Sequence, residues 1–455
     1  MIMAMIRPET EMKDSGIEWI GDIPSNWETT PLKKIVVDRA GGAWGNEPYE
    51  NNSTICMRIA DFDFDRGVFQ DKSETELTKR SYKEYQIDKL LLQTNDICIE
   101  KSGGGEKTPV AISIFFYKPY YTLFSNFIDR IKVDNAVSFP KYVEYYLRAM
   151  YFLSVTTLYI KQTTGIQNLN VTSLLEKEVI TLPSLSEQQA IADYLDETCS
   201  KIDEIIAEAK ASIDEYKEVK QSVIFEAVTK GLGENVELKD SGAEGMGTIP
   251  ASWSVVRFMK VNYVRARLGW KGLKAEEYVD IGYPFLAAYH IVNSHLRWEN
   301  LNCITKERYD ESPEIKLSIG DLVLVKDGAG IGKCARIDDM PLGEATVNSS
   351  LSVITPNELL DYRYEYYYFM SPLFQNIIAR LKNGMGVPHL TQESMKDIYL
   401  PLPSKKEQQA IADYLDNKVV ELDTLIAEKE SLINDLEAYK KSLIYEVVTG
   451  KRRVV

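Results

Sequence analysis

The segment DGAGIGKC, which begins at Asp327, comes nearest to a phosphate-binding loop in this sequence. In a loop of the form GxxxxGK[ST], backbone N–H groups cradle the phosphates, the lysine reaches them and the final hydroxyl binds magnesium. Here Asp327 replaces the first glycine and Cys334 replaces the hydroxyl residue. Lys333 also replaces the last glycine of a GxGxxG dinucleotide loop. Nucleotide-dependent chemistry in this chain is therefore not supported.

Carboxylates, histidines and cysteines form no catalytic or metal-binding pattern either. Asp96, Glu100 and Lys101 loosely resemble a nuclease set, but the second half has Val325 in place of Glu100, so we expect solvated charges at a strand end. The five cysteines form no CxxC pair, which argues against a zinc site. An Asn/Asp-Pro-Pro-aromatic segment, which would hold a flipped base for amino-methylation, is also missing. We predict no catalytic residue and no metal site, with single structural histidines at His290, His295 and His389.

Two pairs of polar loops occupy matching places in the first and second halves of the chain. EKSGGGEKT, from Glu100, matches KDGAGIGK, from Lys326. KQTTGIQNLN, from Lys161, matches KNGMGVPHLT, from Lys382. Glycine lets backbone N–H groups approach a phosphate closely, and lysine and amide side chains can contact phosphates and base edges. Tight hairpins are the alternative interpretation of the glycine loops.

The segment RARLGWKGLK, from Arg265, is the strongest local basic patch. Basic side chains attract DNA phosphates when they share a face, and a solvated run of charge is the alternative interpretation. This segment and the loops predict the following DNA-contacting residues: Lys101, Ser102, Lys107, Lys161, Gln162, Gln167, Asn168, Arg265, Arg267, Lys271, Lys274, Lys326, Lys333, Asn383 and His389.

The overall charge of −15, from 53 basic and 68 acidic residues among 455, would by itself argue against a nucleic-acid partner. Most of that charge lies in two segments, residues 187–226 and 407–446. The rest of the chain is nearly neutral and leaves room for local basic surfaces. No apolar run is long enough to cross a bilayer, and the N-terminus does not resemble a secretory signal. A cytoplasmic protein without membrane contact is expected.

A long internal repeat organises the chain. The ten residues EQQAIADYLD occur unchanged at 187–196 and at 407–416, an offset of 220. KDSG and IPSNW, from Lys13 and Ile23, reappear as KDSG and IPASW, from Lys239 and Ile249. A period of this length is too long for a solenoid. The chain is therefore predicted to be one α+β module written twice, giving a pseudo-two-fold arrangement.

Each repeat of the decapeptide opens a predicted long helix. Ser184 and Ser404 stand three residues before a glutamate, which is the spacing of a capping box. Apolar residues then recur at steps of three and four, which is typical of a coiled coil, and lysines such as Lys220 and Lys440 interrupt them. A helix of 40 residues is about 60 Å long. The predicted contact line, or seam, between the two helices consists of Leu195, Ile202, Ile206, Ile213, Leu415, Leu422, Ile426 and Ile433.

Chain connectivity predicts that the two helices are antiparallel. The end of the first helix leads within about 20 residues into the second globular domain. In a parallel pair this linker would have to run back along the whole helix, which about 20 fully extended residues could only just do. The predicted organisation is α+β, with two similar globular domains separated by an antiparallel coiled coil. The predicted segments are a first globular domain at 1–183, a long helix at 184–231, a linker at 232–248, a second globular domain at 249–403, and a second long helix with its C-terminal tail at 404–455.

These features together resemble the specificity subunit of type I restriction–modification systems. The resemblance rests on the LPS…EQQAIADYLD segments, the IPSNW and IPASW domain starts, and the strand and glycine loop of GDLVLVKDGAGIGK, and it covers essentially the whole chain. It implies that each globular domain is a target recognition domain reading one half of a split, asymmetric sequence in double-stranded DNA. It also implies that the coiled coil docks two methyltransferase subunits and, through them, restriction/translocase subunits.

The resemblance further implies a non-catalytic chain, with S-adenosylmethionine, ATP and Mg bound by partner subunits. The alternative hypothesis is a scaffold whose coiled coil assembles other proteins and which does not bind DNA. Protection of two half-sites on a duplex, measured with a methyltransferase partner present, would distinguish the two hypotheses.

Overall fold

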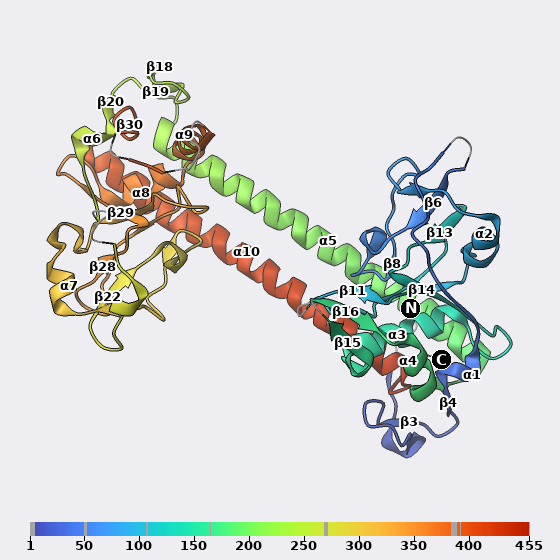
Figure 1. Cartoon of the computed structure of the whole chain (residues 1–455). Coiled ribbons are helices and arrows are strands. Elements are labelled where there is room, and N and C mark those ends of the chain that lie inside the picture. The colour runs from blue at the N-terminus through green and yellow to red at the C-terminus, as the bar shows by residue number, and fades with distance from the viewer. Residues whose placement is uncertain are drawn as a thin grey trace. The chain divides into compact units, whose positions relative to one another are not determined.

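The computed structural model describes residues 5–49, 52–105, 108–163, 165–267, 272–383, 389–391 and 393–454. The chain divides into two compact units (Figure 1), of which unit 1 comprises residues 1–210 with 430–455 and unit 2 comprises residues 211–429. The boundary crosses both long helices, α5 (Leu185–Lys230) and α10 (Lys405–Val448). Each unit therefore contains a globular α+β part and one half of each long helix.

The globular part of unit 1 is built on a six-stranded mixed sheet of order β5-β14-β10-β12-β8-β7. A parallel pair, β6 and β13, belongs to a second sheet with β9. Helices α1 (Leu32–Ile35), α2 (Glu84–Leu90), α3 (Pro140–Phe152) and α4 (Val171–Lys177) accompany the sheets. The strands are β1 (Met5–Ile6), β2 (Met12–Asp14), β3 (Asp22–Pro24), β4 (Glu28–Pro31), β5 (Val36–Gly41), β6 (Thr54–Met57), β7 (Phe62–Asp63), β8 (Val68–Phe69), β9 (Lys79–Arg80), β10 (Ile97–Glu100), β11 (Ser102–Gly103), β12 (Ser113–Phe115), β13 (Thr122–Phe124), β14 (Ile128–Val133), β15 (Ile160–Thr163), β16 (Ile166–Leu169), β17 (Val179–Leu182) and β31 (Arg452–Arg453).

The globular part of unit 2 repeats the same core. Its four-stranded sheet has the order β21-β29-β26-β27, which corresponds to β5-β14-β10-β12 of unit 1, and its parallel pair is β22 and β28. The helices are α6 (Phe258–Val261), α7 (Lys306–Asp310), α8 (Tyr362–Met370) and α9 (Pro372–Asn383). The strands are β18 (Leu238–Asp240), β19 (Thr248–Pro250), β20 (Ser254–Arg257), β21 (Asn262–Ala266), β22 (Tyr283–Leu286), β23 (Ile291–Val292), β24 (His295–Leu296), β25 (Cys303–Ile304), β26 (Leu322–Val325), β27 (Cys334–Arg336), β28 (Thr346–Val347), β29 (Leu351–Pro356) and β30 (Tyr399–Leu402). The shared strand order supports the duplication expected from the sequence.

The two long helices begin as the sequence predicts. Ser404 forms a capping box with Glu407, because its hydroxyl accepts from the Glu407 N–H at 3.3 Å and its own N–H donates to the Glu407 carboxylate at 3.1 Å. The hydroxyl of Ser184 likewise accepts from the N–H of Glu187 at 3.3 Å. All predicted seam residues are buried except Ile426, which is half-buried. The apolar periodicity therefore identified the packed faces of both helices.

Two ion pairs show that the long helices are antiparallel. In unit 1 the Lys440 ammonium lies 2.5 Å from a carboxylate oxygen of Asp203. In unit 2 the Lys220 ammonium lies 2.6 Å from a carboxylate oxygen of Asp423. Asp203 precedes Lys220 in α5, whereas its partner Lys440 follows Asp423 in α10, so the two helices run in opposite directions. The lysines that interrupt the apolar pattern are thus paired with acids on the facing helix.

The repeated decapeptide attaches each globular part to the start of its long helix. Its glutamates, Glu187 and Glu407, accept hydrogen bonds from the indole N–H groups of Trp27 at 3.1 Å and Trp253 at 3.3 Å, respectively. These tryptophans end the IPSNW and IPASW segments, so the two repeated motifs of the sequence bind one another in each unit.

The first glutamine of each decapeptide is fully buried and joins the helix to the loop before α3 or α8. Gln188 accepts from the N–H of Phe139 at 2.8 Å and donates to the carbonyl oxygens of Val137 and Pro183. Gln408 does the same in unit 2, where it accepts from the N–H of Asp361 at 2.7 Å. A buried glutamine with both ends satisfied fixes the position of the neighbouring backbone.

We expect Gln188→Ala to lower the free energy of unfolding by about 2 kcal/mol, because it removes the side-chain partner of the Phe139 N–H and of two carbonyl groups. Urea titration would measure this change. Gln189→Ala is the matched control, since the Gln189 amide donates to Asp193 on the surface of the same helix. Equal effects of the two substitutions would contradict the anchoring role of Gln188.

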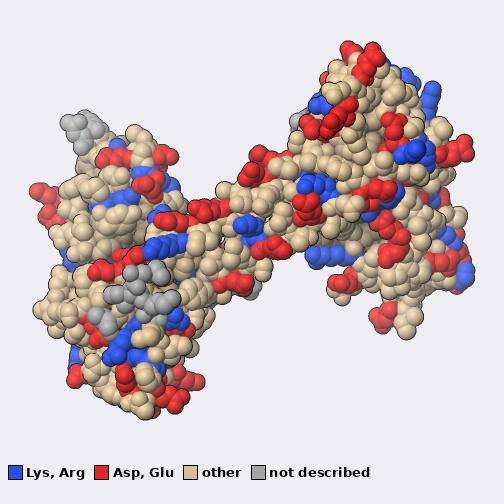
Figure 2. All heavy atoms as spheres, turned by 180° about the vertical axis from the view of Figure 1, so that it is seen from behind, with Lys and Arg blue, Asp and Glu red and all other residues tan. Residues whose placement is uncertain are grey.

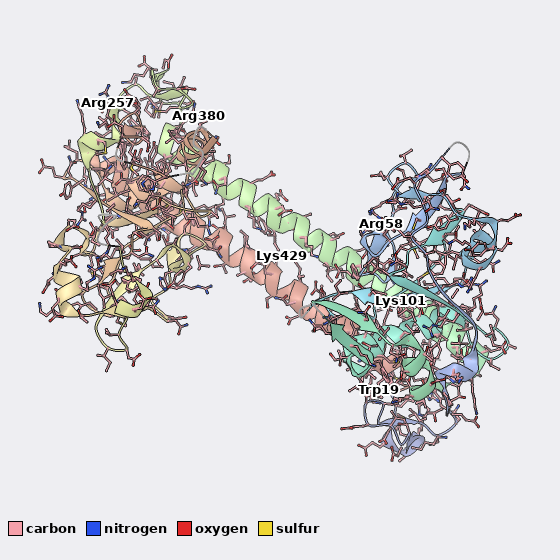
Figure 3. All side chains as sticks on the ribbon, in the orientation of Figure 1. Trp19, Arg58, Lys101, Arg257, Arg380 and Lys429 are labelled. Atoms are coloured by element: carbon pink, nitrogen blue, oxygen red, sulfur yellow. The ribbon has the colours of Figure 1, made fainter. Side chains whose placement is uncertain are left out.

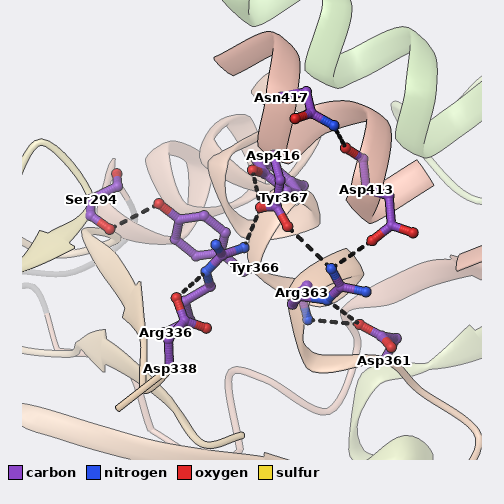
Figure 4. Close-up of polar contacts among 10 residues, drawn as sticks. All are labelled: Ser294, Arg336, Asp338, Asp361, Arg363, Tyr366, Tyr367, Asp413, Asp416 and Asn417. Atoms are coloured by element: carbon purple, nitrogen blue, oxygen red, sulfur yellow. Dashed lines mark hydrogen bonds and ion pairs between the residues drawn. The ribbon is translucent and has the colours of Figure 1, made fainter. Parts of the chain in front are cut away.

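The final aspartate of each decapeptide binds a tyrosine of the aromatic helix. Asp196 accepts from the hydroxyl of Tyr145 at 2.6 Å, and Asp416 accepts from that of Tyr367 at 2.7 Å. In unit 2 the Asp416 carboxylate also binds Arg336 of β27 and Arg363 of α8 (Figure 4). The aromatic side chains of α3 and α8 are mostly buried, which agrees with their predicted role in the core.

Each globular part also binds the end of the opposite long helix. The hydroxyl of Tyr142, on α3, lies 3.1 Å from the carbonyl oxygen of Val448 near the end of α10. The hydroxyl of Tyr364, on α8, lies at the same distance from the carbonyl oxygen of Val228 near the end of α5. Each unit therefore joins the start of one long helix and the end of the other to the same globular core.

Candidate nucleic-acid interface

In unit 1 the two polar loops predicted from the sequence meet in one small sheet. Strand β11, in the glycine loop, pairs with β16, and β16 pairs with β15, in the order β11-β16-β15. The hydroxyl of Ser102 donates to the amide oxygen of Asn168 at 2.8 Å. Asn168, Lys161 and Gln162 are exposed. Segments about 60 residues apart in the sequence thus present an amide, a lysine and a hydroxyl on neighbouring strands.

Gln167 supports this loop from within. Only 8% of its surface is exposed, its amide oxygen accepts from the N–H of Val110 at 3.1 Å, and its amide N–H group donates to the carbonyl oxygen of Gly105. Gly104 has a φ of +60°, and a Cβ atom there would lie 2.7 Å from the backbone nitrogen of Val110. The structure therefore makes Gln167 a support of the loop, and not the exposed base-contacting residue that the sequence predicted.

Lys101 lies at the base of the same loop (labelled in Figure 3). Its ammonium is 2.7 Å from a carboxylate oxygen of Asp129, a residue that is buried and also binds Arg39. Lys101 remains 27% exposed. Asp129 was not singled out by sequence reasoning, although it lies on the largely buried strand β14, next to Arg130. The local pattern around Asp129 showed only that β14 is a strand.

In unit 2 the corresponding loops also meet. An isolated antiparallel bridge joins Asp327 to His389, and the N–H of Leu390 donates to the carbonyl oxygen of Lys326 at 2.9 Å. The Asp327 carboxylate binds the imidazole of His389 and the ammonium of Lys326. Although burial opposes ionisation of Asp327, these two partners hold its pKa below the usual value.

The candidate residues of this second loop differ in exposure. The Lys326 residue is only 8% exposed and its charge is paired with Asp327. Lys333 is exposed, with its carbonyl oxygen accepting from the N–H of Val325 at 2.8 Å. His389 is also exposed. Lys333 and His389 are thus accessible to a ligand, whereas Lys326 acts mainly in the loop itself.

The prediction of a basic patch from Arg265 onward is wrong for Arg265 and Arg267. Arg265 donates to the backbone carbonyl of Glu314 and to the carboxylate of Asp321, both at 2.9 Å. Arg267 is only 3% exposed and donates to the carbonyl oxygen of Val347. These guanidinium groups hold the sheet to its neighbouring segments, and in this structure they present no charge to a ligand.

The other candidates stand as follows. Lys274 is exposed, before a short 3-10 turn, and its backbone N–H donates to Glu277 at 2.7 Å. Asn383 ends α9. Lys107 and Lys271 lie outside the described residues.

The charged residues of the glycine-loop strand are not solvated, contrary to the sequence prediction. Asp96 and Glu100 are 3% and 4% exposed. Gln93 donates its backbone N–H to Asp96 at 2.9 Å, whereas burial raises the pKa of Glu100 to about 7. Sequence alternation could not reveal this, because the cover over Glu100 comes from distant segments.

Glu100 should give the stability of the protein a distinct pH dependence. Between pH 4.5 and pH 7 the Glu100 carboxyl is protonated in the folded state. In the unfolded chain, where its pKa is near 4.5, the same carboxyl has released that proton. The free energy of unfolding should therefore fall as the pH rises from about 4.5 to about 7. Urea titrations across this range should show that Glu100→Gln reduces this fall, whereas the exposed control Glu18→Gln keeps it. An unchanged pH profile in Glu100→Gln would contradict the burial of a proton-binding carboxyl.

Acidic and basic side chains are interspersed over the described residues on the face drawn in Figure 2. Within the described part of the chain, no cluster of histidine, cysteine and acidic residues could hold a metal ion, and no helix is long and apolar enough to span a membrane. The candidate interface therefore consists of polar loops on the globular parts, without a large basic surface on this face.

The sequence model described as "Type I restriction modification DNA specificity domain" matches residues 24–215 and 269–437. The chain belongs to this family. Each match covers most of one globular part and continues into a long helix, so the specificity domain occurs twice.

Two relatives of this specificity protein come from Methanocaldococcus jannaschii. The type I restriction enzyme MjaVIII specificity subunit is 26% identical over 371 residues, covering 80% of this chain and 81% of the relative. The putative type I restriction enzyme MjaX specificity subunit is 24% identical over 446 residues, covering 96% of each chain. The similarity extends over both halves of the chain.

A solved structure concerned with complex assembly and conformational transition of the type I R-M system contains a chain of the same fold. The TM-score is 0.71 at 14% identity, covering 94% of this chain and 99% of that one. The two chains therefore share the α+β fold with a coiled coil.

Proposed function

We propose that this chain is the sequence-specific DNA-binding specificity subunit of a type I restriction–modification system. The observation that carries the proposal is the doubled specificity domain, whose two copies each bring matching polar loops together, by pairing of β11 with β16 in unit 1 and by the bridge between Asp327 and His389 in unit 2. Each copy would read one half of a bipartite DNA target. The role is non-catalytic, and chemistry belongs to partner subunits.

The two half-sites should differ in sequence, because the loops differ in chemistry. Unit 1 offers Ser102, Lys161 and Asn168, whereas unit 2 offers Lys333 and His389. An amide and a hydroxyl make hydrogen bonds with base edges that a lysine and an imidazole do not reproduce. The target is therefore expected to be asymmetric.

The coiled coil is proposed to hold the two readers at a set separation and to dock two methyltransferase subunits. The repeated decapeptide supports this, since it gives the helix starts the same contacts in both units. A partner that recognises the start of one long helix could bind the start of the other in the same way. Restriction/translocase subunits would join through the methyltransferases, with S-adenosylmethionine, ATP and Mg bound by those partners.

Sequencing of modified bases in cells that express this chain with its native methyltransferase tests the proposal. The expected result is one methylated motif made of two different half-sites separated by a spacer of fixed length. The motif should disappear when the gene for this chain is deleted. Methylation that continues unchanged without the chain would contradict the proposal.

A further inference from the structure

A cavity of about 680 Å³ opens in unit 1 beside the candidate interface. Gly104 of the glycine loop forms part of its wall, so the cavity and the interface share a loop. Phe64, Tyr151 and Phe152 contribute aromatic surface, and Lys441 contributes a positive charge from α10. A cavity of this size is within the range of small-molecule and cofactor sites.

The polar group that distinguishes this cavity is Glu100. It is only 4% exposed and lines the cavity. Within the described residues burial alone accounts for the raised pKa of its carboxyl group, with no hydrogen bond or opposite charge to offset it. A buried polar group without a partner is unfavourable, and such groups are uncommon in folded proteins. A ligand that donated a hydrogen bond to Glu100 would remove this cost.

The walls favour a flat ring close to an anion. The rings of Tyr151 and Phe152 lie 6.0 Å apart at an interplanar angle of 63°, and Phe64 is 43% exposed. The ammonium of Lys441 lies 5.8 Å from the centre of the Phe152 ring. Lys441 offers a counter-charge to an anionic group, although Asp65 also lines the cavity. A purely apolar ligand would leave Glu100 without a partner.

We propose that this cavity binds a nucleotide whose base carries an exocyclic amino group, such as adenine or cytosine. The base would stack on Phe64 and Phe152, donate its amino hydrogen to Glu100 and place its phosphate near Lys441. The proposal deepens the proposed function, because the nucleotide could be an unpaired residue of the bound DNA. A free nucleotide offers the same chemistry.

Calorimetric titration of the full chain with dAMP, dCMP and dTMP tests the site. The expected result is that dAMP or dCMP binds about tenfold more tightly than dTMP. Glu100→Leu should abolish this preference, whereas Glu100→Gln, whose amide oxygen still accepts a hydrogen bond, should keep most of it. Absence of nucleotide binding, absence of base preference, or a preference that survives in Glu100→Leu would each overturn the proposal.

Phe64→Ala is a second variant that does not disturb the buried strand, and it should weaken all nucleotides by a similar factor. Its matched control is Tyr121→Ala, since Tyr121 is 56% exposed and does not line the cavity. Equal affinities of Phe64→Ala and Tyr121→Ala would overturn the stacking role. Thermal unfolding of every variant checks that it remains folded.

Two duplexes distinguish the sources of the nucleotide. Tighter binding to a duplex with one unpaired adenine than to the fully paired duplex supports a residue of DNA as the ligand. Equal binding to the two duplexes, with dAMP still bound, supports a free nucleotide. Failure of the proposed function would appear separately, as no binding of either duplex while the nucleotide titrations retain their base preference.

Discussion

Replacement of Lys440 by Asp should destabilise unit 1 by about 2–4 kcal/mol, because it leaves two carboxylates facing one another between the long helices. The Lys440 side chain is only 7% exposed and that of Asp203 is 20% exposed, so water screens this pair weakly. Lys440 also donates to the carbonyl oxygen of Asp65 at 2.9 Å, and this bond would be lost as well. Urea titration of the full chain would measure the loss.

The corresponding pair of unit 2 allows the two residues to be exchanged. Lys220→Asp should cost less than Lys440→Asp, because Asp423 is 38% exposed. Adding Asp423→Lys to Lys220→Asp should restore most of the stability, since the charges would again be opposite. Lys201→Asp is the control, because Lys201 pairs with Glu197 on the exposed face of α5. Failure of the exchanged pair to recover stability would contradict a direct contact between the antiparallel helices.

Replacement of both Lys161 and Asn168 by Ala should weaken binding of the full complex to its DNA target about 100-fold. Loss of a base contact generally costs about 1–3 kcal/mol, and loss of a phosphate contact lowers the salt dependence of binding. Both side chains are exposed on the β15–β16 hairpin, where their removal leaves the core intact. Affinity measured at several salt concentrations separates the two contributions.

The same variant also tests the division of labour between the units. Discrimination should be lost at the half-site read by unit 1 and kept at the other. Lys333→Ala should instead remove discrimination at the half-site read by unit 2 and keep it at the half-site read by unit 1. Lys201→Ala, on the long helix, serves as the control and should leave affinity for DNA unchanged. A uniform loss of discrimination at both half-sites would contradict independent reading by the two units.

The long helices and the duplication could be predicted because their signals are local or directly repeated. A step of three and four residues marks one face of a helix regardless of what packs on it, and the buried seam residues, such as Leu195 and Leu415, follow that pattern. The serine caps follow an equally local rule, as Ser404 and Glu407 show. The antiparallel direction followed from the length of the linker alone.

The candidate site was less predictable because its contacts join distant segments. Arg265 was expected on the surface, but its partner Asp321 lies far along the sequence and becomes its neighbour only when the sheet forms. The burial of Glu100 depends in the same way on the segments that line the cavity. Composition indicated which loops were polar and glycine-rich. It could not indicate that Ser102 would meet Asn168, since that pairing requires β11, β15 and β16 to form one sheet.

Hydroxyl-radical footprinting of the complex with its methyltransferase partner, on DNA that contains the methylated motif, tests the central claim most directly. The account predicts two protected stretches separated by an accessible spacer, with protection of only one stretch weakened by the Lys161 and Asn168 substitutions. A single continuous protected stretch, or loss of both stretches together in that variant, would contradict it.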